Sequence, residues 1–347
     1  MNDDMARALE TLFYPFALGA LKGFSQDSGI LFLNALPHVF LKTLPVEKVL
    51  CQQYFRPYAT GLERAGFTVQ TALETGEDLF DAVLLLLPKN HVEAQYYMAH
   101  GACHLREGGL LIAAADNKAG GARLESLFSD FGFQKIQALS KHKARVVWGI
   151  KGAVPEGISE KALKAGRPQQ VLGRAFWSCP GIFGWDKIDR GSKILLQTLP
   201  DTLSGSVADF GCGYGYLSHA LLQQKKMTSL LCIDADFRAL EMCHKNLEGQ
   251  NCNIKISYLW EDLQHPVAGI RGLDCVVMNP PFHEGKSTKP VLGIDCIRTA
   301  GESLKKGGML WMVCNTHLAY EKTLHDIFRL VTKKFEGQGF KVFCAVK

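Results

Sequence analysis

Three segments of the first half of the chain recur in the second half in the same order, and this limits the folds that the chain can adopt. The pairs are VLCQQYFRPYATGLERAGF (49–67) with LLCIDADFRALEMCHKNLEG (230–249), FDAVLLLLPKN (80–90) with LDCVVMNPPFH (273–283), and LREGGLLIAAADN (105–117) with LKKGGMLWMVCNT (304–316). Such self-similarity indicates that one structural unit occurs twice.

Within each half, short apolar runs alternate with segments of helical periodicity. After the run 230–233, for example, Phe237, Leu240 and Leu247 recur at the spacing of one buried helical face. This alternation is typical of a parallel sheet with helices on both faces. The stretch 335–347 instead has a glycine-containing turn before a β-rich run, which predicts an antiparallel hairpin. The predicted fold class is α/β, with two tandem Rossmann-like domains, each a mostly parallel sheet that ends in a hairpin.

The length and composition allow two domains. A chain of 347 residues, of which 47% are hydrophobic, can bury a core in each of two domains of ordinary size. The segment 151–172 is rich in Gly, Pro and Lys, as boundaries between domains often are. We expect a first domain over residues 1–155, a linker over 156–175 and a second domain over 176–347.

The charge is small overall but unevenly distributed. The net charge of +5 does not by itself indicate a nucleic-acid partner. Between Lys135 and Arg190, however, there are 11 Lys or Arg residues and only 4 Asp or Glu residues. This excess fits a stripe that faces phosphates, and it fits a solvated linker equally well.

Cysteine usage and hydropathy favour a soluble cytoplasmic protein. The 11 cysteines form no C-x-x-C pair and lie mostly in apolar runs, which favours buried free thiols over disulfides or a metal site. The longest apolar runs, such as 12–21, fall short of the roughly 20 residues that a membrane span needs. The segment 1–10 carries three acidic residues against one arginine, the opposite of a signal sequence.

A glycine-rich loop follows an apolar run in the second half. In SVADFGCGYGYLS (206–218), the candidate ligand-binding positions are Asp209, Gly211, Cys212, Gly213 and Gly215. Small residues are needed where the backbone turns sharply from a strand into a helix and a ligand approaches the main chain. The dinucleotide fingerprint G-x-G-x-x-G would require glycine where this chain has Tyr216, so NAD binding is disfavoured.

Two carboxylates follow later strands. Asp234 ends the second apparent strand of this half, where a carboxylate can accept hydrogen bonds from both hydroxyls of a ribose. As an alternative it could cap the following helix, although Asp236 is better placed for that role. Asp262 follows the third strand and is a candidate to hold an adenine amino group, but an ordinary loop carboxylate would look the same.

The fourth apparent strand ends in Asn279, Pro280, Pro281 and Phe282. Prolines restrict the backbone and can end a strand, so these residues could form a rigid turn with Phe282 packed into the core. Their place behind a glycine loop and Asp234 offers another interpretation, which rests on a family resemblance.

The loop, the acidic residue after the second strand and the N-P-P-F together resemble a class I S-adenosylmethionine-dependent methyltransferase that acts on an amino nitrogen. From about residue 30 to its end, the chain resembles the ribosomal RNA small subunit methyltransferase C family. The stretches that carry the resemblance are CPGIFGWDKIDRGSKILLQTL (179–199), VADFGCGYGYLS (207–218) and MNPPFHEG (278–285). The family implies two tandem methyltransferase-like domains, of which the second is active on the exocyclic N2 of a guanine in 16S rRNA, in helix 34 of the 30S subunit.

The resemblance also implies roles for the site residues. S-adenosylmethionine would be held by Asp209, Gly211, Cys212, Gly213, Gly215, Asp234 and Asp262. An exocyclic amine conjugated to a purine is a poor nucleophile; the Asn279 side-chain oxygen and the Pro280 carbonyl could each accept one N–H and aim the lone pair at the methyl group. Pro281 would stiffen the turn, and Phe282 would stack on a flipped base, a contact worth roughly 1–3 kcal/mol.

Further substrate contacts are expected nearby. The segment 180–188 would cover the cofactor or the incoming base, with Phe183 and Trp185 as stacking groups, although ordinary packing is an equal alternative. His283 and Lys286 could contact the target or its phosphate, and a solvated loop is equally compatible with them.

The first half lacks these residues. Gln53 stands in the place of Asp234, LLPK (86–89) replaces N-P-P-F, and no G-x-G-x-G follows the run 30–38. We therefore expect the first domain to bind no cofactor, and the family implies that it supports folding of the second domain or engages RNA.

Several other functions remain open. The 23S rRNA guanine-N2 enzymes have the same two-domain plan, while adenine-N6 and protein-glutamine methyltransferases share only the amine chemistry. A non-catalytic RNA-binding or assembly factor would require the loss of residues such as Asp209, Asp234 and Asn279, all of which are present. The expected partner is 16S rRNA or the 30S subunit, bound by a monomer without a metal.

Overall fold

The computed structural model describes residues 3–73, 79–250, 254–281, 283–284, 287–288 and 290–347. The chain divides into two compact units, residues 1–167 and 168–347. The segment 156–175, which we expected to be a linker, contains helix α5 (Ile158–Gly166). Its Ala162 is buried in the same core as helix α3 (His91–His104), so most of this segment is an integral part of the first unit.

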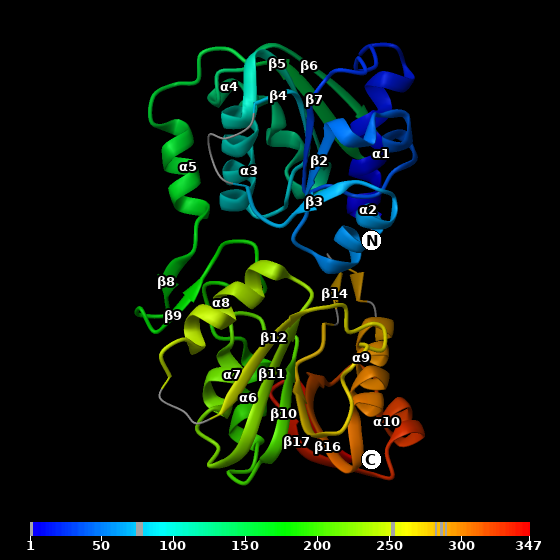
Figure 1. The fold of residues 1–347 in the computed structure, drawn as a ribbon, viewed down its shortest axis with the longest axis vertical. Coiled ribbons are helices and arrows are strands. Elements are labelled where there is room, and N and C mark those ends of the chain that lie inside the picture. Colours follow the sequence, from blue (N-terminus) through cyan, green and yellow to red (C-terminus); the bar gives the residue numbers. More distant parts are fainter. Residues whose placement is uncertain (1–2, 74–78, 251–253, 282, 285–286, 289) are drawn as a thin grey trace. The chain divides into compact units, whose positions relative to one another are not determined.

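The first unit is a seven-stranded sheet, coloured blue to green in Figure 1. The strand order is β3-β2-β1-β4-β5-β7-β6; β7 is antiparallel to both of its neighbours and the other pairs are parallel. The strands are β1 (Ile30–Leu33), β2 (Val49–Gln52), β3 (Thr68–Gln70), β4 (Phe80–Leu86), β5 (Leu105–Asp116), β6 (Gln134–Lys141) and β7 (Ala144–Ile150). The remaining helices are α1 (Asp3–Ala17), α2 (Arg56–Arg64) and α4 (Leu124–Asp130), with short 3₁₀ turns η1 (Val39–Thr43), η2 (Val46–Lys48), η3 (Asn117–Ala119) and η4 (Gly121–Arg123).

The second unit, green to red in Figure 1, repeats this plan in the order β12-β11-β10-β13-β16-β18-β17. Again only the last two pairings are antiparallel. The strands of the sheet are β10 (Ser204–Phe210), β11 (Lys226–Asp234), β12 (Lys255–Trp260), β13 (Leu273–Met278), β16 (Leu304–Asn315), β17 (Leu330–Gly337) and β18 (Phe340–Val346). The helices are α6 (Arg190–Thr198), α7 (Tyr216–Leu221), α8 (Phe237–Leu247), α9 (Pro290–Ser303) and α10 (Glu321–Ile327), and two small hairpins pair β8 (Gln169–Val171) with β9 (Phe176–Ser178) and β14 (His283–Glu284) with β15 (Ser287–Thr288). The predicted fold class is confirmed.

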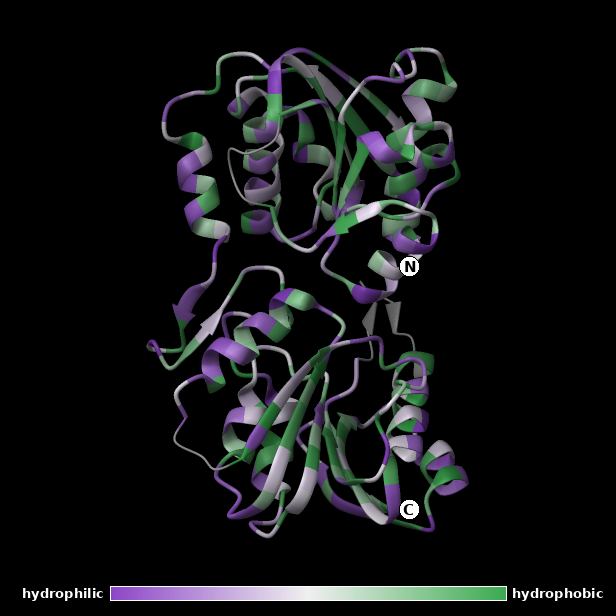
Figure 2. Ribbon diagram, in the orientation of Figure 1, coloured by the Kyte–Doolittle hydropathy of each residue, from purple (hydrophilic) through white to green (hydrophobic). Residues whose placement is uncertain are grey.

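Each sheet is covered on both faces because successive strand residues point to opposite sides. In the first unit, Val83 packs in the core formed with α3 and α4, whereas Leu84 packs in the core formed with α1. In the second unit, Val276 belongs to the core under α9 and α10, and Val277 to the core under α6, α7 and α8. Figure 2 shows green hydrophobic stretches along strands of both sheets and a mixture of green and purple along the helices, as expected for buried strands and amphipathic helices. Among the described residues, no helix is long and apolar enough to cross a membrane.

The repeat extends to individual contacts. Cys51 pairs with Phe32 in the first sheet as Cys232 pairs with Asp209 in the second. β4 and β13 each carry an aspartate near their start that accepts a backbone N–H at 2.8 Å. The donor is the residue just before β1 in the first unit and a residue of β10 in the second. Each aspartate also forms an ion pair with a cation near the start of the next strand, β5 or β16. In the first unit the donor, the aspartate and the cation are Gly29, Asp81 and Arg106. In the second unit they are Ser206, Asp274 and Lys305.

At the carboxyl edge of the first sheet, amide side chains join neighbouring strands. Asn34 follows β1 in the left-handed region (φ 52°), and its Nδ2 donates to the Leu86 carbonyl of β4 at 3.1 Å. Its backbone N–H donates to the side chain of Gln52 (3.2 Å), whose own amide donates to the Thr71 carbonyl (2.9 Å). The ends of β1, β2 and β4, and the residue after β3, are thus connected.

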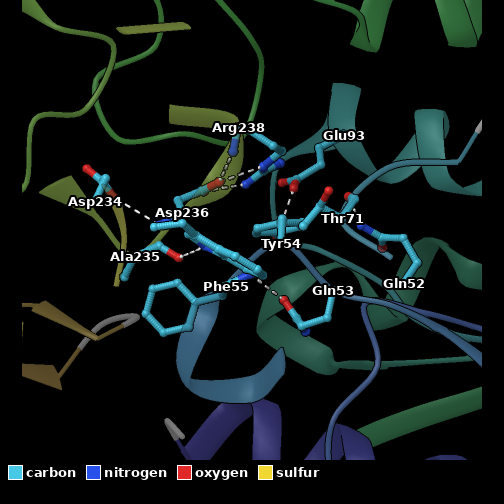
Figure 3. A network of polar contacts seen from close by, with 11 residues as sticks. Gln52, Gln53, Tyr54, Phe55, Thr71, Glu93, Asp234, Ala235, Asp236 and Arg238 are labelled. Carbon is cyan, nitrogen blue, oxygen red and sulfur yellow. Dashed lines mark hydrogen bonds and ion pairs between the residues drawn. The ribbon is translucent and has the colours of Figure 1, made fainter. Parts of the chain in front are cut away.

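Gln53 completes this set of amides (Figure 3). Its Nε2 donates to the Ala35 carbonyl at 2.7 Å, and its Oε1 accepts the Phe55 N–H at 2.8 Å. With only 2% of its surface exposed, Gln53 satisfies two main-chain groups from inside the protein.

We expect Gln53→Ala to lower the local free energy of unfolding at β1 and β2 by about 2–4 kcal/mol, because two buried main-chain groups lose their partner and a cavity opens. Native-state hydrogen exchange of the backbone amides in urea measures this value. The matched control is Gln70→Ala, whose side chain is exposed at the end of β3. Equal exchange in the two variants would contradict this role of Gln53.

Candidate active site

The predicted site residues gather at one edge of the second sheet. The glycine loop follows β10, Asp234 ends β11, Asp262 follows β12 and Asn279 follows β13. The carboxyl ends of parallel strands lie at one edge, and β10 is the strand at which the order reverses direction, where open α/β sheets bind ligands.

The glycine loop is held to β11 and leaves open space above its centre. The Gly211 and Cys212 N–H groups donate to the Ile233 carbonyl at 2.8 and 3.0 Å. Gly211, Gly213 and Gly215 have φ of 76°, 54° and 89°, in the left-handed region that side chains rarely adopt. A Cβ placed on Gly213 would meet no described atom within 4 Å, so a ligand can reach the main chain there.

The Asp234 carboxylate accepts two backbone hydrogen bonds and has further acceptor positions. One of its oxygens accepts the Gly213 N–H at 2.8 Å. The other accepts the Asp236 N–H, also at 2.8 Å (Figure 3). A carboxylate has about four acceptor positions, so each oxygen can still accept a ligand hydroxyl. Burial raises the pKa of Asp234 to about 6. The cap of α8 is Asp236, as the sequence indicated, so the capping alternative for Asp234 is not needed.

Asp209 presents a buried acceptor without a partner. Its Oδ2 accepts the Ser218 hydroxyl at 2.6 Å, whereas Oδ1 has no hydrogen-bond partner among the described residues. Burial raises its pKa to about 7, against the lowering effect of the Ser218 hydrogen bond. A buried acceptor beside an open glycine loop fits a ligand that brings a donor.

Asn279 is held by two acceptors at the start of α6, the N-cap residue and a residue of the first turn. Its Nδ2 donates to Asp189 Oδ2 at 2.8 Å and to Ser192 Oγ at 2.9 Å. Both N–H groups of the carboxamide are therefore used, and Oδ1 is the atom that can accept a hydrogen bond from a ligand. The Asn279 main-chain carbonyl lies 4.0 Å from the position of a Cβ on Gly211, so this strand end borders the glycine loop.

The rest of the tetrapeptide is only partly described. Pro280 is buried and Pro281 is exposed. Phe282 and Lys286 lie outside the described residues. His283 begins the short strand β14, in which it pairs with Thr288 of β15.

The chain just before the segment 180–188, which we expected to cover the site, is joined to the glycine loop. Asn246 of α8 donates to the carbonyls of Trp177 (2.8 Å) and Tyr214 (2.7 Å) and accepts the Trp177 N–H (2.6 Å). Cys179 and Ile182 then pack with Tyr214 in one apolar cluster. Within this segment the Phe183 side chain is 67% exposed, which leaves its ring available for stacking.

Three other candidate residues, Cys212, Asp262 and Trp185, differ in how their side chains are placed. The Cys212 side chain is buried and hydrogen-bonds the Cys243 thiol, so only its main chain borders the loop. Asp262 accepts the Gln264 N–H at 2.9 Å and remains partly exposed. Trp185 packs against the apolar cluster around Tyr214, as in the ordinary-packing alternative. Among the described residues, no group of His, Cys, Asp and Glu could hold a metal ion.

Sequence reasoning missed the partners of the central residues. Asp189 and Ser192 contact Asn279, and Ser218 contacts Asp209. The available signal was the D-R-G-S stretch at the start of α6, which contains a helix cap, but its contact lies 90 residues away along the chain.

Comparisons with known proteins agree with this geometry. Residues 173–344 match the family model of the methyltransferase small domain, and residues 21–142 match the model of its N-terminal domain. A ribosomal RNA small subunit methyltransferase C from Shewanella halifaxensis is 28% identical over 93% of this chain and 95% of its own length. The protein of that name from Shewanella loihica is 30% identical over 76% of each chain.

A solved structure supports the fold over the whole chain. The 16S rRNA N2 methyltransferase of T. thermophilus, in complex with AdoMet and guanosine, matches with a TM-score of 0.79 over 100% of this chain and 92% of its own, at 23% identity. With both domain models matched in order and a relative at 30% identity over three quarters of its length, the chain belongs to the ribosomal RNA small subunit methyltransferase C family.

Proposed function

We propose that the second unit transfers the methyl group of S-adenosylmethionine to the exocyclic N2 of a guanine in 16S rRNA. Relatives that carry the name of this activity, and a structural neighbour with AdoMet and guanosine bound, support the proposal. The observation that carries it is Asn279, whose two N–H groups are engaged so that its Oδ1 is left as an acceptor beside an open glycine loop.

The cofactor fits the residues at the edge of the sheet. Asp234 has acceptor positions left for two ribose hydroxyls. The Asp209 Oδ1 has no donor within the part of the chain that the structure describes, and a ligand could supply one. The main chain of Gly211, Cys212, Gly213 and Gly215 would line the cofactor, and Asp262 would accept the adenine amino group. When bound, S-adenosylmethionine supplies a methyl group on a sulfonium, whose C–S bond breaks as the new N–C bond forms.

The chain itself activates the amine. Asn279 Oδ1 and the Pro280 carbonyl each accept one N–H of the guanine N2, which draws its lone pair out of conjugation and toward the methyl carbon. The proton released from the methylated nitrogen passes to solvent, so no strong base is required. Pro280 and Pro281 restrict the turn that presents the carbonyl.

The RNA would be held by residues around this point. The exposed Phe183, which follows Ile182 of the apolar cluster around Tyr214, would stack on a base. Phe282, His283 and Lys286 would contact the flipped guanine or its phosphate. The target would be a helix 34 guanine in the 30S subunit, methylated in the cytoplasm by a monomer. The first unit, whose corresponding edge is joined by amides, would bind no cofactor and would support the second unit or engage RNA.

The direct test offers tritiated S-adenosylmethionine with 16S and 23S rRNA, each free and within its unmodified subunit, followed by nucleoside analysis. N2-methylguanosine in 16S rRNA is the expected product. Label in 23S rRNA alone would transfer the assignment to the large subunit, and the absence of label in every RNA would contradict the proposal.

We expect Asn279→Ala to slow methyl transfer at least a hundredfold, because an acceptor aimed at the reacting amine is removed. Cofactor affinity should change less than threefold, since the glycine loop and Asp234 remain. Single-turnover methylation and calorimetric titration with S-adenosylmethionine measure the two quantities. A rate close to that of the wild type would rule out the proposed role.

We expect Asp234→Ala to weaken S-adenosylmethionine binding at least tenfold, since two hydroxyl acceptors and an anchor of the Gly213 N–H are lost together. Titration calorimetry measures the Kd. Asp201→Asn, in the exposed turn after α6, removes a charge elsewhere in the same unit and serves as the control. Equal Kd values for the two variants would leave Asp234 as a merely structural residue.

Cofactor affinity should depend on pH in a defined direction. The pKa values of Asp234 and Asp209 are raised to about 6 and about 7, so a fraction of each carboxyl group is protonated near neutral pH. Hydrogen bonds donated by the cofactor favour the charged forms, so binding releases protons and tightens from about pH 5 to about pH 8. Calorimetry in two buffers of different ionisation enthalpy measures the release. Proton uptake, or weaker binding at the higher pH, would contradict this linkage.

A further inference from the structure

The start of α6 makes three linked contacts in the second unit. Asp189 is the N-cap of this helix, and its Oδ2 accepts the Ser192 N–H at 2.8 Å. The same oxygen accepts Nδ2 of Asn279, also at 2.8 Å, and the Ser192 hydroxyl oxygen receives the second N–H of that amide at 2.9 Å. This short turn therefore caps α6 and also hydrogen-bonds Asn279, the residue that follows β13.

These contacts fix which way the carboxamide of Asn279 points. An amide turned by 180° about its terminal bond exchanges an acceptor for a donor with almost no change in shape. An ionised carboxylate only accepts, so Asp189 can bond the NH₂ group of Asn279 but would repel its oxygen. The flipped amide would also offer the incoming amine a donor where an acceptor is needed.

We propose that Asp189 and Ser192 are positioning residues for methyl transfer, which hold Asn279 with its Oδ1 toward the substrate amine. This inference rests on the proposed function and adds to it the residues that act through Asn279. The charge of Asp189 contributes in addition, because a hydrogen bond from the amide to a carboxylate polarises the carboxamide and strengthens Oδ1 as an acceptor. The nitrogen becomes more positive as the methyl group is transferred, so this acceptor is most effective in the transition state.

Gly191, between the two positioning residues, gives independent support. A Cβ at this position would lie 3.1 Å from Asp189 Oδ2 and 3.1 Å from a ring carbon of Phe340. The carboxylate oxygen that bonds Asn279 would have to shift to make room, so glycine preserves the geometry of the contact.

A plain capping role for Asp189 is the alternative, and Asp189→Asn separates the two. Asparagine caps a helix about as well as aspartate, so α6 should keep its stability. The variant keeps the shape of the side chain, and its Oδ1 can take the place of the Asp189 Oδ2 that caps α6 and bonds Asn279, but it loses the charge that polarises the Asn279 amide. We expect methyl transfer to unmodified 30S subunits to slow at least tenfold in single turnover, with the Kd for S-adenosylmethionine changed less than twofold and the Tm nearly unchanged.

Two further variants serve as controls for Asp189→Asn. Asp201→Asn makes the same chemical change at an exposed position just after α6, and its rate should stay within twofold of the wild type. Ser192→Ala removes one of the two acceptors and should slow transfer less than Asp189→Asn does. A wild-type rate for Asp189→Asn would overturn the inference.

A double-variant cycle distinguishes action through Asn279 from any other effect of Asp189. If Asp189 acts by positioning that amide, Asp189→Asn should slow transfer less than twofold when added to Asn279→Ala. An equal tenfold loss in both backgrounds would overturn the positioning role. The result for Asn279→Ala alone tests the proposed function separately, since a slow Asn279→Ala with a fast Asp189→Asn refutes only the present inference.

Discussion

Parallel strands that end at one edge of a sheet leave main-chain groups that must find partners beyond the sheet, and this requirement shapes both units. The two edges solve it with the same geometry. Gln53 accepts the Phe55 N–H at 2.8 Å in the first unit, and Asp234 accepts the Asp236 N–H at 2.8 Å in the second. A residue two positions beyond a paired cysteine anchors the chain in each copy.

The residue type at this position differs between the units. It decides whether the hydrogen-bonding groups at the sheet edge are used within the unit or can bind a ligand. An amide both donates and accepts, so Gln53 bonds two main-chain groups of its own unit. A carboxylate only accepts, so Asp234 keeps acceptor positions that donors from a ligand can fill. The difference between the units is larger on the neighbouring strand, where the first unit has Phe32 and the second has Asp209. One oxygen of Asp209 has no partner among the residues that the structure describes. A few residues on a duplicated frame thus account for the contrast between the units.

Much of the site followed from local pattern. Alternating apolar and helical periodicity predicted both sheets, the hairpins and the strand ends at which the glycine loop, Asp234 and Asn279 lie. Other features could not be predicted in this way. The segment 156–175 contains more helix than its Gly, Pro and Lys content indicated, because α5 is stabilised by packing on α3. The side chain of Cys212 turns into the core, because its direction depends on the packing of α8 below the loop.

The sequence by itself determined the class of fold, the duplication, and the kind of chemistry available at the end of each strand. These three features depend on residue types and on their spacing within single segments, and strands and helices can be predicted from that spacing. Only the tertiary structure decided which polar groups meet. Asp189 and Asn279 are 90 residues apart along the chain. They meet because α6 packs on the same face of the sheet as Val277, near the end of β13. The orientation of the Asn279 amide, and with it the acceptor offered to a substrate, is therefore a property of the folded unit and of no single segment.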